Sequence, residues 1–312
     1  MDTQPGERSG NRNETLRVVM SERRQLVNLA YRLLGSLAEA EDVAQETYAR
    51  WYSMSPDEQS AIEKPGAWLT TVASRICLDL LGSARSRRER YVGEWIPEPL
   101  PDHSDWLSGR AGGASVDPVD RVTLDESISM AFLVVLESMT PAERVAFVLH
   151  DVFRYSFAEV AEIVGRTPAA CRQLATSARR RVRESRAPET PTAQQARIVQ
   201  DFRDAWAAND IDGLVALLDP NVTAIADGGG IVSAVLLPMQ GSLEVARGFA
   251  GIASRGGPTF EILVRNVNGQ PGLVAQVDGT TIAVVAFDIA ADRITRVWAV
   301  RNPEKLQPWV RG

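Results

Sequence analysis

The segment 156–183 constrains the fold of this chain most strongly, because its pattern predicts two short helices joined by a tight turn. Ser156 and Glu159 have the spacing of a capping box, so the first helix is predicted to begin there and to end at Gly165. Thr167 caps the second helix, which has a proline in its first turn, where the missing N–H costs no hydrogen bond. Each helix has one apolar stripe. The pattern therefore predicts a helix-turn-helix.

The second of these helices carries its polar side chains opposite the apolar stripe. Arginine and glutamine can reach base edges and phosphates in a major groove, and hydroxyl groups add phosphate contacts. Residues 166–186 include seven arginines and one acid, although the whole chain has a net charge of −6. An ordinary solvated basic face is the alternative interpretation. The candidate DNA-contacting residues are Thr167, Arg172, Gln173, Thr176, Ser177, Arg179, Arg180, Arg181 and Arg183.

Length and composition indicate a multi-domain protein, since 312 residues exceed one typical core. Cys77 and Cys171 lie on apolar helix faces and match neither a disulfide framework nor a metal-ligand spacing. The first residues lack the apolar stretch of a signal peptide. No apolar run approaches the roughly 18 residues that span a bilayer. We therefore expect a cytoplasmic protein with no membrane segment, no metal and no other cofactor.

The chain divides into three folded blocks joined by two linkers. The predicted boundaries are 16–91 and 120–186 for two helical blocks, 92–119 for the linker between them and 192–312 for a third block. Prolines stiffen the start of the first linker, at 95–101. The third block opens with amphipathic helices and continues with strands, which predicts an α+β domain. Its strand-like segments are 259–267, 273–277, 280–288 and 293–300.

A helix predicted over 38–51 has two distinct faces. The residues that can face inward are Ala40, Val43, Ala44, Thr47 and Trp51. An acidic, amide-rich group on the opposite face suits docking on a basic helical partner, although a solvated face is the alternative. This group consists of Asp42, Gln45, Glu46 and Arg50.

The helix predicted over 65–81 has a polar side next to an arginine-rich stretch. Unstacked nucleic-acid bases are held by hydrogen bonds, stacking and cationic backbone contacts, and this side supplies polar and cationic groups. We expect a buried stripe of Leu69, Val72, Ala73, Ile76 and Leu80. We expect Thr70 to be exposed with the candidate strand-contacting residues Trp68, Thr71, Ser74, Arg75, Arg85, Arg87 and Arg88. Core packing is the alternative role for Trp68.

Several motifs in a fixed order carry a resemblance to a known family. Residues 38–48 (AEAEDVAQETY) resemble the polymerase-binding helix of the bacterial sigma-70 superfamily, in its extracytoplasmic-function class. Residues 68–73 (WLTTVA) resemble its −10 helix, and the helix-turn-helix is similar to its −35-reading domain. The motifs that resemble the subgroup with a fused SnoaL-like domain, of the NTF2-like cone fold, are 95–100 (WIPEPL), 227–230 (DGGG) and 302–306 (NPEKL).

The resemblance implies a fold and a function. The fold is two all-α sigma domains, region 2 and region 4, followed by an α+β NTF2/SnoaL-like domain. The function is that of an alternative, stress-response sigma factor that binds the beta-prime clamp and beta flap regions of core RNA polymerase, recognises −10 and −35 promoter elements and starts transcription. Arg-Asn is commoner in the family where this chain has Ser74-Arg75, so base-by-base −10 specificity does not carry over.

The fused domain is expected to regulate the protein in cis, so that no dedicated anti-sigma factor is required. Its glycine run permits backbone conformations that other residues disfavour, and the resulting loop is expected to dock on the first helical domain and the linker. The candidate regulatory contacts are Trp95, Pro97, Pro99, Asp227, Gly228, Gly229, Gly230, Asn302, Pro303, Lys305 and Leu306.

Relatives of the SnoaL-like domain include cyclases and isomerases with a His or Asp acid/base. The only histidines here, His103 and His150, lie outside this domain, and Asp227 beside three glycines fits a tight loop better than a buried acid. We therefore expect no enzyme activity. Two alternatives stay open: a bifunctional protein with a cyclase- or isomerase-like cone, and a helix-turn-helix repressor with a ligand-sensing cone. Whether a small ligand occupies the cone is also open.

Overall fold

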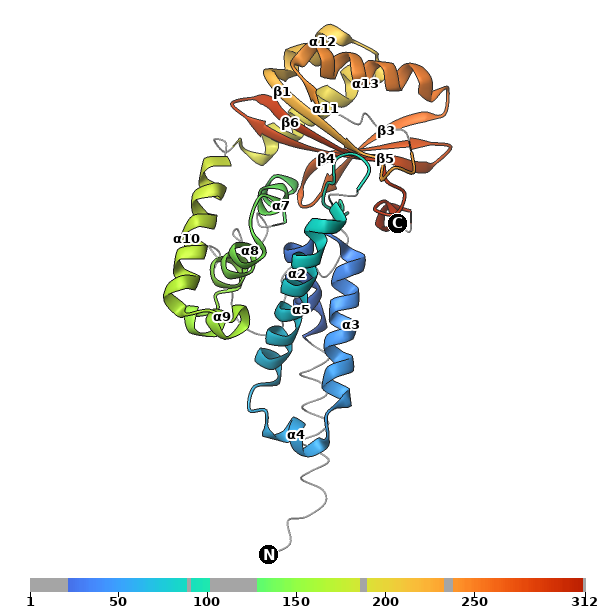
Figure 1. Ribbon diagram of the computed structural model, residues 1–312. Coiled ribbons are helices and arrows are strands. Elements are labelled where there is room, and N and C mark those ends of the chain that lie inside the picture. Colours follow the sequence, from blue (N-terminus) through green and yellow to red (C-terminus); the bar gives the residue numbers. More distant parts are fainter. Residues whose placement is uncertain (1–21, 89–90, 102–127, 186–189, 233–237, 311–312) are drawn as a thin grey trace, which may run out of the picture. The chain divides into compact units, whose positions relative to one another are not determined.

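The computed structural model describes residues 22–88, 91–101, 128–185, 190–232 and 238–310, with the backbone alone at 84–88 and 253–256. These residues form two compact units (Figure 1). The first, helical unit comprises described residues up to 85 and 139–180. The second unit comprises described residues 86–101, 128–138 and 181–310. No described helix is both long enough and apolar enough to cross a membrane.

The first helical domain begins with an antiparallel helix pair. Gly35 ends α2 with a positive φ of 72°, a backbone conformation that favours glycine. Ser36 then caps α3 by accepting a hydrogen bond from the Glu39 N–H. Ser55 and Glu58 form a complete capping box on α4. The helices are α2 (Arg23–Leu34), α3 (Leu37–Ser53), α4 (Pro56–Ala61) and α5 (Pro65–Arg88).

The predicted helix-turn-helix is present. Ser156 and Glu159 make the reciprocal capping box of α9, and Gly165 ends that helix at φ 70°. The Thr167 hydroxyl accepts a hydrogen bond from the Ala170 N–H at 3.2 Å and so caps α10. The elements of this domain are α8 (Pro141–Phe147), a π-helix (Val148–Val152), α9 (Phe157–Val164) and α10 (Pro168–Ser185).

Sequence periodicity predicted the buried face of α3 correctly. It predicted only part of the buried face of α5. All five inward-facing residues expected on α3 are buried. On α5, Leu69 and Ala73 are buried as expected, but Thr70 and Ser74, which we expected to be exposed, are buried as well. The buried stripe is therefore rotated toward 70 and 74 and away from 72 and 76. Small hydroxyl side chains permit this, as Thr70 donates to the Gly66 carbonyl oxygen within the helix.

A six-stranded sheet, in the order β2-β1-β6-β5-β4-β3, forms the C-terminal domain. Strand β1 runs parallel to β6, and the other neighbours are antiparallel. The predicted α+β class is confirmed, but β1 and β2 were not predicted. The strands are β1 (Leu218–Asp227), β2 (Met239–Gln240), β3 (Phe260–Val267), β4 (Gln270–Val277), β5 (Thr280–Ala290) and β6 (Arg293–Val300).

Three two-residue turns join β3, β4, β5 and β6. Both central residues of each turn have a positive φ, which is the geometry of the tight hairpin turns that match strand twist. Asn268-Gly269 and Asp278-Gly279 are the residue pairs most suited to such turns. These turns fix the register of the four strands and hold Asn268 at one edge of the sheet.

Both faces of the sheet are apolar and both are covered. Helices α11 (Thr192–Ala207), α12 (Ile211–Leu217) and α13 (Ser242–Gly256) pack on one face (Figure 1). On the other face, Trp298 and Val284 pack with Ile96 from the segment 91–101, which we call the linker segment. Helix α7 (Met130–Glu137) completes this second cluster through Met130. The chain between the two helical domains therefore contributes to the hydrophobic core of the C-terminal unit.

The helix-covered core is predicted to depend on Trp206. Its ring is 1% exposed and packs against Phe249, and its indole N–H donates to the Phe249 carbonyl oxygen at 2.8 Å. Trp206→Ala should lower the free energy of unfolding of the C-terminal unit by about 3–5 kcal/mol in urea melts. Leu243→Ala, at an exposed position of α13, should change it by less than about 0.5 kcal/mol. Equal losses for the two variants would contradict this assignment of the core.

Candidate polymerase, promoter and regulatory surfaces

The predicted polymerase-binding group lies together on the exposed face of α3. Asp42, Gln45, Glu46 and Arg50 are all exposed. Glu46 and Arg50 form an ion pair of 2.8 Å, one helical turn apart, with about half of each side chain accessible. Surface pairs of this kind contribute little to stability, so these side chains are available to a partner.

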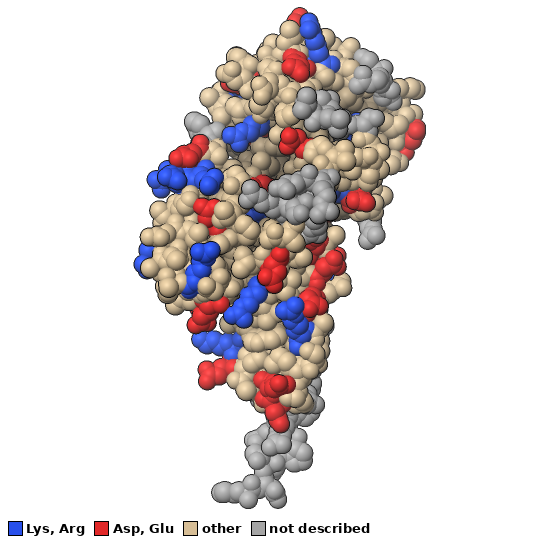
Figure 2. All heavy atoms as spheres, in the orientation of Figure 1, with Lys and Arg blue, Asp and Glu red and all other residues tan. Residues whose placement is uncertain are grey.

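The recognition helix α10 presents most of its predicted DNA contacts to solvent. Arg172, Gln173, Thr176, Arg180, Arg181 and Arg183 are exposed, as is the cap Thr167. Figure 2 shows basic side chains near the C-terminal end of this helix, with acidic side chains beside them. The Arg172 guanidinium lies over the Phe157 ring, with 5.2 Å from its central carbon to the ring centroid. This contact positions Arg172 without burying it.

Two members of the predicted −35 group point back into the protein. Arg179 is half-buried and pairs with Asp151 at 2.6 Å, and the Ser177 hydroxyl donates to the Glu143 carboxylate at 2.7 Å. Our expectation that these two side chains lie on the free outer face is therefore wrong. They occupy the border between the apolar stripe and the outer face, where acids of the preceding elements can reach them.

The predicted −10 residues do not form one exposed face. Ser74 is fully buried, so its predicted exposure is wrong. Trp68 is half-buried and packs edge-on against Trp51, with 5.3 Å between ring centroids, in line with the core role. Thr71 is half-buried and donates to the Ala67 carbonyl oxygen.

Among the described side chains of this group, Arg75 is an exposed cation. Its guanidinium donates to the Glu162 carbonyl oxygen of α9 at 2.9 Å, within the first unit. Arg85, Arg87 and Arg88 belong to α5, but their side chains lie outside the described part of the structure.

The linker segment is attached to the sheet by one buried carboxylate. Asp227, at the end of β1, is fully buried, which corrects our expectation that it fits a tight loop better than a buried acid. Its carboxylate accepts hydrogen bonds from the Tyr91 hydroxyl at 2.6 Å and from the Ile96 N–H at 3.1 Å. The Gly229 N–H donates to it as well, at 3.0 Å. Burial, and then the hydrogen bond and charge of Asp227, raise the pKa of the Tyr91 phenol.

Lys305 neutralises this carboxylate and extends the contact. Its ammonium lies 2.7 Å from an Asp227 oxygen and also donates to the Ile96 carbonyl oxygen. The same ammonium lies 4.2 Å from the centroid of the Trp95 ring and 5.2 Å from that of Tyr91. A buried ion pair is favourable when hydrogen bonds satisfy its remaining valences, and the linker segment provides them here.

The remaining members of the regulatory group surround this pair. Asn302 is buried and donates from its amide to the Tyr91 hydroxyl at 2.9 Å. Gly229 has a φ of 64°, and a side chain there would collide with Asn302. Gly228, Pro97, Pro99 and Leu306 are buried, Gly230 is exposed at φ 71°, and Pro303 is exposed.

Sequence analysis missed three residues of this attachment: Tyr91 within the linker segment, and Asn268 and Trp309, which contact that segment. The Trp309 indole donates to the Pro99 carbonyl oxygen at 2.8 Å. Tyr91 and Trp309 lie just outside the recognised motifs, and motif matching gives no signal for them. An Asn-Gly pair such as 268–269 is typical of a hairpin turn, but turn chemistry alone does not indicate a contact with a distant segment.

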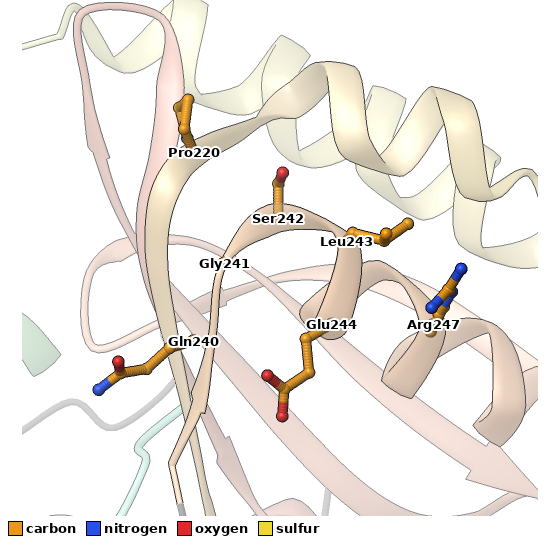
Figure 3. A pocket seen from close by; sticks show the side chains of 7 residues that line it. All are labelled: Pro220, Gln240, Gly241, Ser242, Leu243, Glu244 and Arg247. Atoms are coloured by element: carbon orange, nitrogen blue, oxygen red, sulfur yellow. The ribbon is translucent and has the colours of Figure 1, made fainter.

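Aromatic side chains pack between the helices and the sheet of the C-terminal domain. Phe202, Trp206, Phe249 and Phe287 pack there with centroid separations of 4.8–6.4 Å. A separate open pocket of about 580 Å³ lies outside this core, where β2 leads into α13 (Figure 3). Its lining side chains include Gln240, Glu244 and Arg247. In Figure 3 the Glu244 carboxylate and the Arg247 guanidinium point away from one another.

Comparison with known proteins gives consistent matches along the chain. The family models Sigma-70 region 2 and Sigma-70, region 4 match residues 18–87 and 129–182. The extracytoplasmic-function (ECF) RNA polymerase sigma factor SigJ of Mycobacterium tuberculosis is 39% identical over 295 residues, covering 91% of this chain and 90% of the relative. The probable ECF sigma factor SigI of the same species is 35% identical, covering 92% of each chain.

A solved structure agrees with these sequences. The crystal structure of Mycobacterium tuberculosis SigJ superposes with a TM-score of 0.70 at 36% identity, and the match covers 92% of this chain and 96% of that one. The match extends over both helical domains and the C-terminal α+β domain. The helix-turn-helix, the motif order and these matches together show that the chain belongs to the extracytoplasmic-function sigma factors of the sigma-70 family.

Proposed function

We propose that the C-terminal domain regulates this sigma factor in cis by holding the linker segment that joins its two sigma domains. Sigma factors bind core RNA polymerase and promoter DNA and start transcription, and they are not enzymes. The proposal therefore concerns control of that activity. The observation that carries it is the buried contact of Asp227 and Lys305 with the linker segment.

The position of the linker segment in the chain makes this contact suitable for control. It follows α5 of region 2 by two residues and precedes region 4 in sequence. A sigma factor must place its two domains on two promoter elements at once. A domain that grips the chain between them can therefore bias that placement. Because the grip lies within one chain, a dedicated anti-sigma factor is not required in this proposal, and contact of the C-terminal domain with region 2 remains a further prediction.

The same proposal assigns the exposed faces of the two sigma domains. The Asp42, Gln45, Glu46 and Arg50 face of α3 binds core RNA polymerase. The exposed cations of α10 bind the −35 element, and Arg75 with the arginines at the end of α5 contacts the −10 strand. The packed interior of the C-terminal domain favours a regulatory domain over a bifunctional one, and dependence on core RNA polymerase separates a sigma factor from a repressor.

Recognition of the −35 element is predicted to depend on Arg172. Its exposed guanidinium, held over Phe157, is placed to contact a base edge, so Arg172→Ala should lose about 1–3 kcal/mol of discrimination at one −35 position. Arg181→Ala should instead weaken binding to all sequences and reduce the salt dependence. Holoenzyme binding to a set of single-base −35 variants measures both effects. Unchanged base preference in Arg172→Ala would contradict this assignment.

Holoenzyme formation is predicted to need the acidic face of α3. Asp42→Ala combined with Glu46→Ala should weaken binding to core RNA polymerase while leaving the thermal midpoint unchanged, because both side chains are exposed. A matched control removes two exposed acids elsewhere, by Asp201→Ala with Glu261→Ala. Core titration followed by fluorescence anisotropy measures the affinities. If the two double variants bound core equally well, this face would not be the polymerase contact.

Regulation is predicted to depend on the Asp227–Lys305 pair. Asp227→Asn leaves Lys305 buried without its counter-charge, which costs about 3–5 kcal/mol, so exchange of the Ile96 amide should rise by roughly two to three and a half orders of magnitude. Adding Lys305→Met removes the unpaired charge and should restore part of the protection. Promoter-dependent transcription by each variant should change together with this exchange.

A matched control for this test is Asp288→Asn on β5 of the same sheet. Asp288 is half-buried and makes one long ion pair of 3.9 Å with Arg296, and it does not contact the linker segment in the described structure. This variant should leave the Ile96 exchange and transcription at parent levels. If the Ile96 amide of Asp227→Asn exchanged faster and transcription stayed at the parent level, the proposed regulation would be overturned.

A further inference from the structure

One asparagine, Asn268, contacts the chain on both sides of the segment 101–127, between the sigma domains. Asn268 is fully buried and is the first residue of the β3–β4 turn, with a φ of 53°. Its side-chain oxygen accepts a hydrogen bond from the Leu100 N–H at 3.0 Å. Its side-chain nitrogen donates to the Ile128 carbonyl oxygen at 2.9 Å. Its own backbone N–H donates to the Leu100 carbonyl oxygen at 2.9 Å.

This double contact brings two distant points of the chain together. The Leu100 nitrogen and the Ile128 oxygen each lie one hydrogen bond from the same carboxamide, so they are at most about 8 Å apart. The sequence between them has 27 residues, a length that can span roughly 90 Å when fully extended. Holding both ends at Asn268 therefore removes most of the reach that this length allows.

The two hydrogen bonds of the Asn268 side chain lie in buried surroundings, where water cannot replace either partner. Leu100 is 0% exposed and Ile128 is 3% exposed. Pro101 forms a bridge with Val267 at the edge of β3, next to Asn268. A buried N–H or carbonyl group that loses its partner keeps its desolvation penalty. The Leu100 N–H and the Ile128 carbonyl group therefore both favour the state in which they are bound to Asn268. An amide side chain suits this place, because it offers one acceptor and one donor at the same time.

We propose that Asn268 is a positioning residue that sets the separation of −10 and −35 elements that this sigma factor accepts. When Leu100 and Ile128 are both bound to Asn268, the chain leaves region 2 and enters region 4 from two points that lie close together. With the contact open, the same chain permits a wide range of separations. The inference rests on the proposed function, since it takes the C-terminal domain to act through the chain between the sigma domains, and it adds the residue and the promoter property on which it acts.

Two substitutions separate the ends of this contact from the folding of the turn. Asn268→Gly removes both side-chain hydrogen bonds, and glycine adopts the positive φ without strain. Asn268→Asp keeps the acceptor for the Leu100 N–H and places a carboxyl oxygen, in place of the amide donor, against the Ile128 carbonyl oxygen, so it opens the Ile128 end alone. The matched control is Asn209→Gly, an exposed asparagine with a φ of 56° in the turn between α11 and α12.

The test is run-off transcription by full-length protein with core RNA polymerase on promoters whose −35 to −10 spacing changes one base pair at a time. Activities are normalised within each variant, because a merely structural defect lowers all spacings alike. The parent and Asn209→Gly should show one sharp optimum. For Asn268→Gly, the ratio of the optimum to a spacing two base pairs away should fall by at least about fivefold, with Asn268→Asp in between. A normalised profile identical to that of the parent would overturn the proposal.

A second set of variants distinguishes two negative outcomes: that Asn268 has no role, and that the C-terminal domain does not regulate transcription at all. The Asp227→Asn protein and its Asp288→Asn control are assayed on the same promoters. If Asp227→Asn changes transcription while both Asn268 variants keep the parent profile, the C-terminal domain acts through Asp227 alone and the role of Asn268 is excluded. If neither site changes transcription, the proposed regulation in cis is itself contradicted.

Discussion

The structure of the C-terminal unit depends on a carboxylate that has no access to water. A buried charge is tolerated only with a counter-charge and enough hydrogen bonds, and Asp227 obtains both from residues far away in sequence. Lys305 supplies the positive charge from the C-terminal tail, and the linker segment supplies a phenol and an amide N–H. Separating the linker segment from the sheet therefore removes the hydrogen bonds that Tyr91 and Ile96 give to this ion pair.

The apolar second face of the sheet acts in the same direction. Strands β4, β5 and β6 bury side chains on both sides, so one layer of helices leaves half of this core uncovered. The linker segment, α7 and Leu306 of the tail cover it. The residues that regulate in our proposal thus also complete a hydrophobic core. Release of the linker segment would expose apolar surface, which costs free energy, and would allow the sigma domains to move more freely.

Local patterns in the sequence were sufficient for much of the fold and for part of the site. Caps and periodicity predicted the helix-turn-helix and both faces of α3, because each signal lies within one helix. The buried Ser74 was missed because hydroxyl side chains can occupy a core at a helix interface. Strand β1 was missed because Asp219-Pro220-Asn221, which follow its first residue, have a turn-like composition. The burial of Asp227 and the double contact of Asn268 arise from segments over 100 residues apart, which no local pattern encodes.

The central claim is that attachment of the linker segment to the sheet and promoter-dependent transcription are coupled. The most direct test measures amide exchange at Ile96 and Leu100 and run-off transcription in the same preparations, across a graded series of substitutions at the attachment points. The account predicts that the change in transcription follows the free energy of opening obtained from exchange. Substitutions that abolish protection of both amides and leave transcription at the parent level would contradict it.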